Sequence, residues 1–91
     1  MTTSTPLIAG VVRAGKGDPV AAARVYVVDA PVSLPDIAAL TGADGTFTIG
    51  VPAAGRYTLE ANAEGWTPVR ETIVAEPGIN HIELRFGTRN A

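Results

Sequence analysis

Glycine and proline recur so often along this chain that a long helix has no room to form. The 91 residues include ten glycines and seven prolines, and both residue types are unfavourable in the interior of a helix. The runs between them are short and either rich in β-branched residues or alternate between apolar and polar side chains, which is the pattern of β-strands. We therefore predict an all-β protein.

Strand-like runs recur at a spacing of about ten residues, with turn signals between them. Six or seven strands at this spacing predict an antiparallel β-sandwich. We expect a single domain over residues 1–91, with an ordered core from about 6 to 86. Alternation assigns these side chains to one inward face: Phe47, Ile49, Tyr57, Leu59, Ala61, Ile82, Leu84 and Phe86. In the run 68–75, Glu71 stands between Val69 and Ile73, which predicts a bulge or an edge strand.

The stretch 30–41 differs from the other connections because it is long and unusually apolar. Ser33 and Asp36 have the spacing of a helix cap, and Pro35 would fit the first turn. We predict a structured loop with room for one turn of helix.

Composition excludes several classes of function. The chain has no cysteine and one histidine, so a disulfide, a zinc–thiolate site or a thiol nucleophile cannot form. The net charge of -2 disfavours nucleic acids and anionic membranes, since both require a basic patch. No apolar run reaches the roughly 20 residues of a membrane helix, and no signal peptide is visible. We expect a cytoplasmic protein without metal or cofactor, and export as part of an assembly remains compatible with this.

Four motifs in order resemble the carboxypeptidase regulatory-like domain. Residues 8–12 and 17–25 are similar to the family patterns Ile-x-Gly-x-Val and Gly-x-Pro-Val-x-Gly-Ala-x-Val. Residues 41–49 and 55–59 resemble Thr-Asp-x-x-Gly-x-Phe-x-Ile and Gly-x-Tyr-x-Leu, and Gly65-Trp66 stands where the family has Gly-Tyr. The resemblance implies a transthyretin-like, seven-stranded Greek-key β-sandwich that acts as an accessory module. In this fold we expect Gly10 to allow a close approach and Asp44-Gly45 to form a tight turn.

Catalytic relatives of this fold need residues that the chain lacks. Hydroxyisourate hydrolase uses several histidines and a C-terminal Tyr-Arg-Gly-Ser, whereas this chain has one histidine and ends in Asn-Ala. Intradiol dioxygenases hold iron with two tyrosines and two histidines. Collagen-adhesin B-type domains form an isopeptide bond with an acid in Tyr-x-Leu-x-Glu, where this chain has Ala61, and Glu60 would face the other side. The resemblance therefore implies a protein that is not an enzyme.

Isolated polar residues offer little chemistry of their own. His81 alternates with Glu83 and Arg85 on a face that we expect to be exposed, with no nucleophile or second ligand beside it. Asp29, Asp36 and Asp44 flank the long loop but lack the close spacing of a calcium loop. Capping and turn roles explain them more simply than a metal site does.

The surplus of apolar residues between 30 and 41 suggests an interaction surface. Its members are Val32, Leu34, Ile37 and Leu40, and they would either complete the core or form a docking surface. An edge strand near 68–74 is a second candidate, by strand addition. We hypothesise a non-catalytic interaction or structural module, a small subunit or adaptor in a larger bacterial or phage-tail-like assembly, with a protein partner or self-association. The alternative is a carbohydrate-binding module with an aromatic contact at Trp66 and Tyr26.

Overall fold

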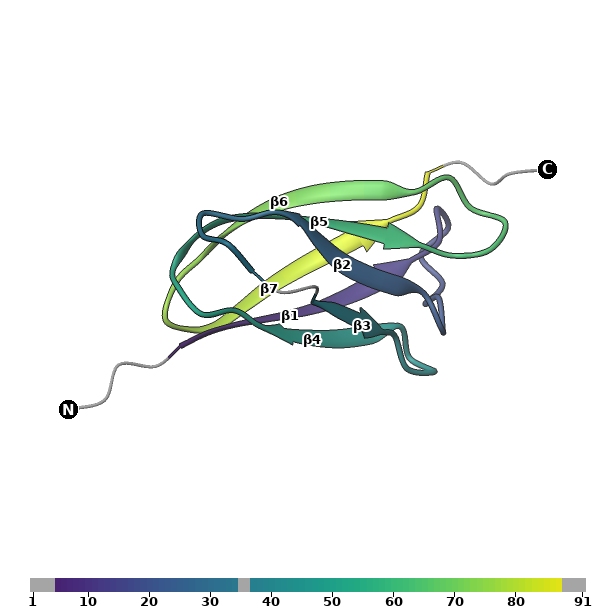
Figure 1. Ribbon diagram of the computed structural model, residues 1–91. Coiled ribbons are helices and arrows are strands. Elements are labelled where there is room, and N and C mark those ends of the chain that lie inside the picture. The colour runs from purple at the N-terminus through teal and green to yellow at the C-terminus, as the bar shows by residue number, and fades with distance from the viewer. Residues whose placement is uncertain (1–4, 35–36, 88–91) are drawn as a thin grey trace.

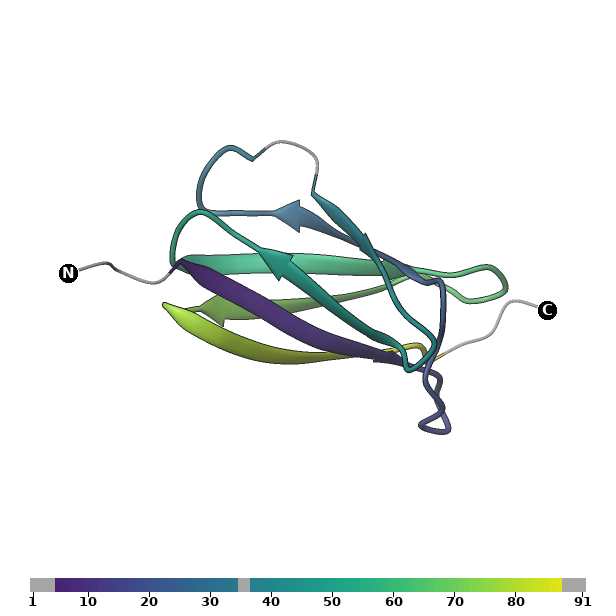
Figure 2. The same ribbon diagram turned by 90° about the horizontal axis from the view of Figure 1, so that it is seen from below.

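The computed structural model describes residues 5–34 and 37–87 as a sandwich of two β-sheets (Figures 1 and 2). Its seven strands are β1 (Pro6–Arg13), β2 (Arg24–Asp29), β3 (Ala38–Leu40), β4 (Thr46–Gly50), β5 (Gly55–Asn62), β6 (Val69–Ala75) and β7 (Gly78–Arg85). The three-stranded sheet has the order β4-β1-β7, and the four-stranded sheet has the order β3-β2-β5-β6. The predicted seven-stranded β-sandwich is confirmed.

One strand pair departs from the antiparallel arrangement that we predicted. The first and last strands, β1 and β7, are parallel, in register from Pro6 with Gly78 to Arg13 with Arg85. Parallel partners cannot be joined by a tight turn, and these two strands are separated by all the others. No local turn signal could therefore have revealed this pairing.

Strand β3 lies in the segment that we predicted to be a loop. Ala38–Leu40 forms β3, which pairs with β2 so that Ala38 faces Tyr26 and Leu40 faces Arg24. Three residues are too few to show a period of two, so local alternation does not predict this strand. Of the predicted helical turn, Pro35 and Asp36 lie outside the described residues, and the described residues contain no helix.

The core lies between the two sheets and consists of the inward faces of the strands. Tyr57, Leu59 and Ala61 on β5 are fully buried, as are Leu84 on β7 and Phe86 directly after it, which confirms the predicted alternation. Burial of each large side chain stabilises the fold by about 1.5–3 kcal/mol. The polar tip of Tyr57 is satisfied, because its hydroxyl donates to the carbonyl of Ala53 at 2.6 Å.

Gly10 allows an aromatic ring to cross the central strand of the three-stranded sheet, as predicted. It pairs with Phe47 on β4 and with Ile82 on β7. A Cβ atom at Gly10 would lie 2.4 Å from Cζ of Phe47 and 2.8 Å from Cγ2 of Ile82. No side chain fits here unless the ring moves, so the core packing requires glycine at this position.

Thr41 connects two loops at one end of the sandwich. Its hydroxyl donates to the carbonyl of Val20 at 2.6 Å and accepts from the amide of Ala23 at 2.9 Å. Thr41 is buried, and among the described residues no buried side-chain nitrogen or oxygen lacks a partner. The β1–β2 connection is thus fixed to the start of the turn that leads into β4.

Candidate functional site

The four apolar residues of the predicted interaction surface differ in their exposure. Leu34 and Ile37 are half-buried and pack against the core. Val32 is 43% exposed and Leu40 is 66% exposed. The four apolar residues of the proposed interaction surface therefore divide into two that contact the core and two that face solvent.

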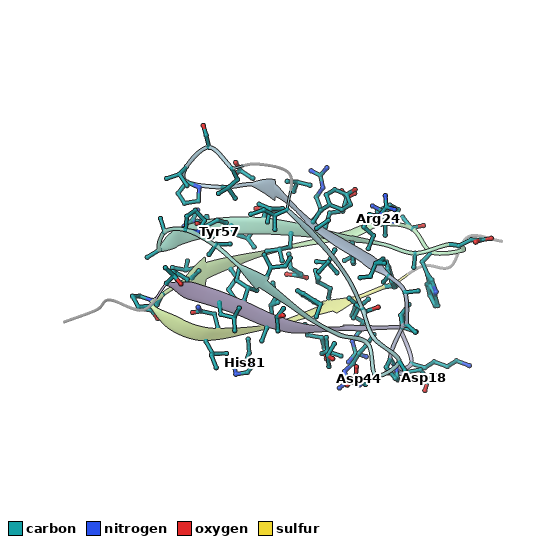
Figure 3. All side chains as sticks on the ribbon, turned by 60° about the horizontal axis from the view of Figure 1, so that its bottom comes forward. Asp18, Arg24, Asp44, Tyr57 and His81 are labelled. Carbon is teal, nitrogen blue, oxygen red and sulfur yellow. The ribbon has the colours of Figure 1, made fainter. Side chains whose placement is uncertain are left out.

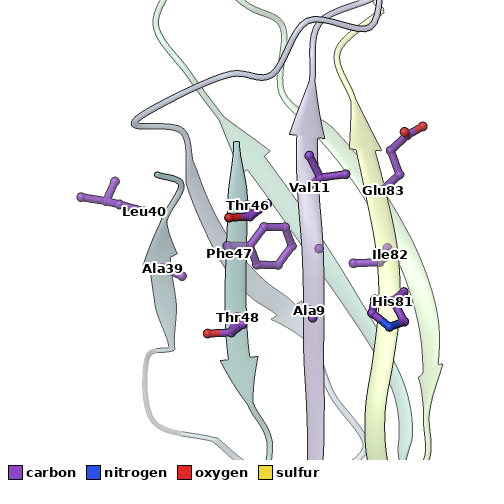
Figure 4. A pocket seen from close by; sticks show the side chains of 11 residues that line it. Ala9, Val11, Ala39, Leu40, Thr46, Phe47, Thr48, His81, Ile82 and Glu83 are labelled. Atoms are coloured by element: carbon purple, nitrogen blue, oxygen red, sulfur yellow. The ribbon is translucent and has the colours of Figure 1, made fainter. Parts of the chain in front are cut away.

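Leu40 also lies beside a shallow groove that crosses four strands (Figure 4). The groove has a volume of about 830 Å³, and Ala9, Gly10 and Val11 of the central strand β1 line it. Figure 4 shows β3 with Leu40 on one side of the groove and β7 with His81 and Glu83 on the other. Small residues on β1 leave this hollow, because the longer side chains stand on the neighbouring strands.

The polar groups of the groove come from β4 and β7. Thr46 and Thr48 contribute hydroxyls, and His81 lies on the outer face as the alternation predicted. The carboxylate of Glu83 is paired with Arg13 at 3.1 Å and with Arg85 at 3.3 Å. In residues 5–34 and 37–87, no group of three or more His, Cys, Asp or Glu side chains could hold a metal ion.

A polar cluster occupies the outer face of the four-stranded sheet. Glu60 accepts hydrogen bonds from the hydroxyl of Tyr26 and from Nδ2 of Asn62, the latter at 2.7 Å. Its other oxygen accepts from Nε of Arg70 at 2.7 Å. The bond from Tyr26 and the bond and charge of Arg70 lower the pKa of Glu60, and the same bond raises the pKa of Tyr26. Glu60 is therefore held as a carboxylate on this face.

The two aromatic residues of the carbohydrate hypothesis lie in different surroundings. Tyr26 belongs to the polar cluster, whereas Trp66 is half-buried and stacks on Phe86 with ring centroids 5.5 Å apart. Trp66 also lines a second pocket, of about 520 Å³, together with Lys16 and Asp18. The structure does not bring the two rings into one joint platform.

The acidic residues that flank the long segment have local roles. Asp44 accepts hydrogen bonds from the hydroxyl and the amide of Thr46, at 2.7 and 3.1 Å, and the hydroxyl bond above all lowers the pKa of Asp44. It stabilises the turn in which Gly45 has a φ of 77°, as predicted. Asp29 accepts from the amide of Ala30 at 3.1 Å, and Asp36 lies outside the described residues.

The polar cluster around Glu60 was not predicted from the sequence. Alternation had placed Glu60 and Asn62 on the outer face of their run, which was correct. Their partners Tyr26 and Arg70 come from strands whose register with β5 is set by tertiary pairing. A search for residues of opposite charge at outward positions on neighbouring strands would have found the pair of Glu60 and Arg70.

The fold defines the chain as a small β-sandwich domain. The carboxypeptidase regulatory-like domain model matches residues 7–85, and the chain belongs to this family. No curated protein matches the sequence. The described part of the chain contains no helix that is long and apolar enough to cross a membrane.

Solved structures share this fold at low sequence identity. A DUF3823 family protein from Parabacteroides merdae has a TM-score of 0.71 at 19% identity, over 93% of this chain and 47% of its own. A chain of a type II Cohesin-X-Dockerin complex from Acetivibrio cellulolyticus has a TM-score of 0.66 at 16% identity, over 92% and 64%. The dioxygenase domain of a dioxygenase carbohydrate-binding protein fusion from Streptomyces sp. SirexAA-E has a TM-score of 0.68 at 15% identity. The match covers 99% of this chain and 83% of that domain's chain. The chain thus spans less than two thirds of the first two proteins, and all three show similarity of fold alone.

Proposed function

We propose that the protein is a non-catalytic interaction or structural module, a small subunit or adaptor in a larger bacterial or phage-tail-like assembly. The observation that carries this proposal is the uneven exposure of the apolar residues between positions 32 and 40. Leu34 and Ile37 pack against the core, while Val32 and, on β3, Leu40 remain exposed. The pairing of β3 with β2 holds the backbone of Leu40, and an apolar residue on a fixed strand loses little conformational freedom when a partner covers it.

The groove beside Leu40 supports the same function. Single exposed apolar residues are common on protein surfaces, but here one lies next to a hollow with small apolar residues on its floor. Covering Leu40 would contribute about 1–2 kcal/mol, since it is 66% exposed in the free protein. A partner side chain in the groove would add to this contribution.

A non-catalytic role agrees with the chemistry of the described residues. The chain has one histidine and no cysteine, and the groove carboxylate of Glu83 is engaged by two arginines. The similarity to a dioxygenase domain is at 15% identity and therefore concerns the fold. The similarity to a chain of the Cohesin-X-Dockerin complex shows that a sandwich of this kind occurs within a protein assembly.

Carbohydrate binding is the alternative, and the observation in its favour is the pocket of Trp66, Lys16 and Asp18. One face of the Trp66 ring packs on Phe86, which leaves less of it for stacking on a sugar. Titration with oligosaccharides, followed by the fluorescence of the single tryptophan, separates the two functions. A saturable change in fluorescence would favour the carbohydrate module.

The interaction module is tested by a charged substitution at Leu40. Leu40→Asp should weaken self-association or partner binding at least tenfold, or ~1.4 kcal/mol. Ile79→Asp is the matched control, because Ile79 is 65% exposed but lies outside the groove. Size-exclusion chromatography with light scattering measures self-association, and quantitative pull-down from the native extract measures partner binding. A wild-type protein that is monomeric and retains no partner would overturn the proposal, as would equal binding by both variants.

A further inference from the structure

Two exposed aliphatic side chains on the four-stranded sheet each stand beside an arginine. On its outer face, Leu40 of β3 pairs in register with Arg24 of β2. Val74 of β6 pairs with Arg56 of β5. Leu40 and Val74 are 66% and 59% exposed, so the arginine stems do not cover them, although arginine often shields an apolar neighbour in this way. We call this surface, with its two pairs, the Arg24–Arg56 face.

The same two arginines have no ion-pair partner among the described residues. Arg13, Arg70 and Arg85 each form an ion pair with a glutamate. Within residues 5–34 and 37–87, Arg24 and Arg56 form none. The arginines free of ion pairs are thus the ones that stand beside exposed aliphatic side chains, a combination suited to a partner with both carboxylates and apolar groups.

The acidic residues on the Arg24–Arg56 face do not neutralise these arginines. Glu60 is engaged by Tyr26, Asn62 and Arg70. Asp29, which pairs with Thr58 beyond a bulge in β2, accepts a hydrogen bond from the amide of Ala30. Among the described strand residues, this face therefore carries the three arginines Arg24, Arg56 and Arg70 against the carboxylates of Glu60 and Asp29, although the whole chain has a net charge of -2.

The spacing of the two pairs indicates the shape of the partner. Arg24 pairs with Asn62 on β5, and Arg56 lies further along the same strand. At about 3.3 Å per residue, the two arginines are roughly 20 Å apart. Figure 3 shows Arg24 on the opposite side of the sandwich from His81. An extended segment of about seven residues would reach from one pair to the other.

We propose that the Arg24–Arg56 face binds an acidic protein segment, whose carboxylates pair with Arg24 and Arg56 and whose apolar side chains cover Leu40 and Val74. This inference rests on the proposed function and names the chemistry of the partner. Nucleic acid and anionic lipid fit less well, because each needs a dense basic patch, whereas the described part of this face offers two arginines without an ion pair. The cluster around Glu60 lies between the two pairs and keeps the middle of the face polar.

A synthetic peptide tests this inference without knowledge of the natural partner. The probe is a twelve-residue peptide of Glu-Leu-Ser repeats, and its controls are the same peptide with lysine or glutamine in place of glutamate. In NMR spectra, we expect the glutamate peptide to shift the backbone amide resonances of Arg24, Arg56, Leu40 and Val74. It should also shift the side-chain Nε–H resonances of the two arginines. The double variant Arg24→Glu/Arg56→Glu should bind it at least tenfold more weakly. Arg85→Glu, on the other sheet, should bind it as the wild type does.

Any result other than the expected pattern of peptide binding overturns the inference. Equal binding of the lysine or glutamine peptide would show that the arginines do not select carboxylates. Shifts confined to the groove, or tighter binding of a single-stranded DNA at the same arginines, would exclude an acidic protein segment as the occupant. If the protein associates through Leu40 while the double variant is unaffected, the interaction module stands and this inference alone fails.

Discussion

At the scale of single residues, Ala22 is the position where sequence and backbone disagree most. Among the described residues, Ala22 is the non-glycine residue with a positive φ, which is 57°. Its amide donates to the carbonyl of Thr41 at 3.0 Å. The family pattern has glycine at this position. A left-handed conformation costs an L-residue about 1–2 kcal/mol, so the fold tolerates strain here to keep the connection with Thr41.

We expect Ala22→Gly to stabilise the protein by up to about 1 kcal/mol. Relief of the strain exceeds the added entropy of glycine in the unfolded chain, which is about 0.4–1 kcal/mol. Urea unfolding followed by tryptophan fluorescence measures the change. Ala21→Gly is the control, because Ala21 is also exposed but has no positive φ. This variant should lower the free energy of unfolding by about a few tenths of a kcal/mol or more. A loss of stability in both variants would show that Ala22 is not strained.

At the scale of strands, the Glu60 cluster joins β2, β5 and β6 on one face of the sheet. Because its hydrogen bonds lower the pKa of Glu60 from its ordinary value in the folded state, the cluster stabilises the protein at neutral pH. This contribution is complete above the pKa of the unfolded chain and is lost as the pH falls through the folded value. The cluster is thus most effective at neutral pH and weakest in acid.

Glu60→Gln should make stability less dependent on pH in the acidic range. We expect a loss of about 1–2 kcal/mol at pH 7, since a charge-assisted network is broken, and a shallower fall in the free energy of unfolding below about pH 5. Asp44→Asn is the comparison, because the pKa of Asp44 is also lowered, by Thr46, in a separate turn. Urea unfolding at a series of pH values measures both. An unchanged pH slope in Glu60→Gln would contradict a role of this carboxylate in the acid response.

Strands could be predicted from the sequence where the residues that alternate along the chain are also the ones buried in the core. Tyr57, Leu59 and Ala61 repeat with a period of two and are all buried, and Gly10 and Gly45 have the roles that local sterics suggested. β3 was missed because it is short and depends on β2 for its pairing. The groove and the Arg24–Arg56 face could not be predicted, because each combines strands that are distant in sequence. The pairing of β3 with β2 places Leu40 beside both the groove and this face.

At the scale of the whole molecule, the edges of the sandwich decide how it meets other chains. β6 is an edge strand of the four-stranded sheet, and its register with β5 is regular, with Glu71 opposite Leu59. The edge position that we predicted for Glu71 is therefore correct, and the bulge is absent from this pair. Glu71 stands on the inward side of the strand yet is exposed. A charge at such a position hinders pairing with another edge.

We expect Glu71→Val to increase association through β6 without loss of fold stability. The substitution makes the inward side of β6 continuously apolar from Val69 to Ala75, which removes the charge that opposes edge pairing. Thr72→Val is the control, since it adds apolar surface to the outer side of the same strand. Light scattering against concentration should show association for Glu71→Val and a monomer for Thr72→Val. Equal behaviour of the two variants would mean that Glu71 does not protect the edge.

The parallel pairing of β1 and β7 determines how the domain responds to mechanical force. β1 begins at one end of the sandwich and β7 ends at the other (Figure 1). A pull on Pro6 and Arg85 is therefore directed along both strands, and it loads the paired residues in shear, all at once. A hairpin pulled at its open end would instead lose its hydrogen bonds one after another. In a chain under tension, this domain would resist as a unit until the whole ladder slides.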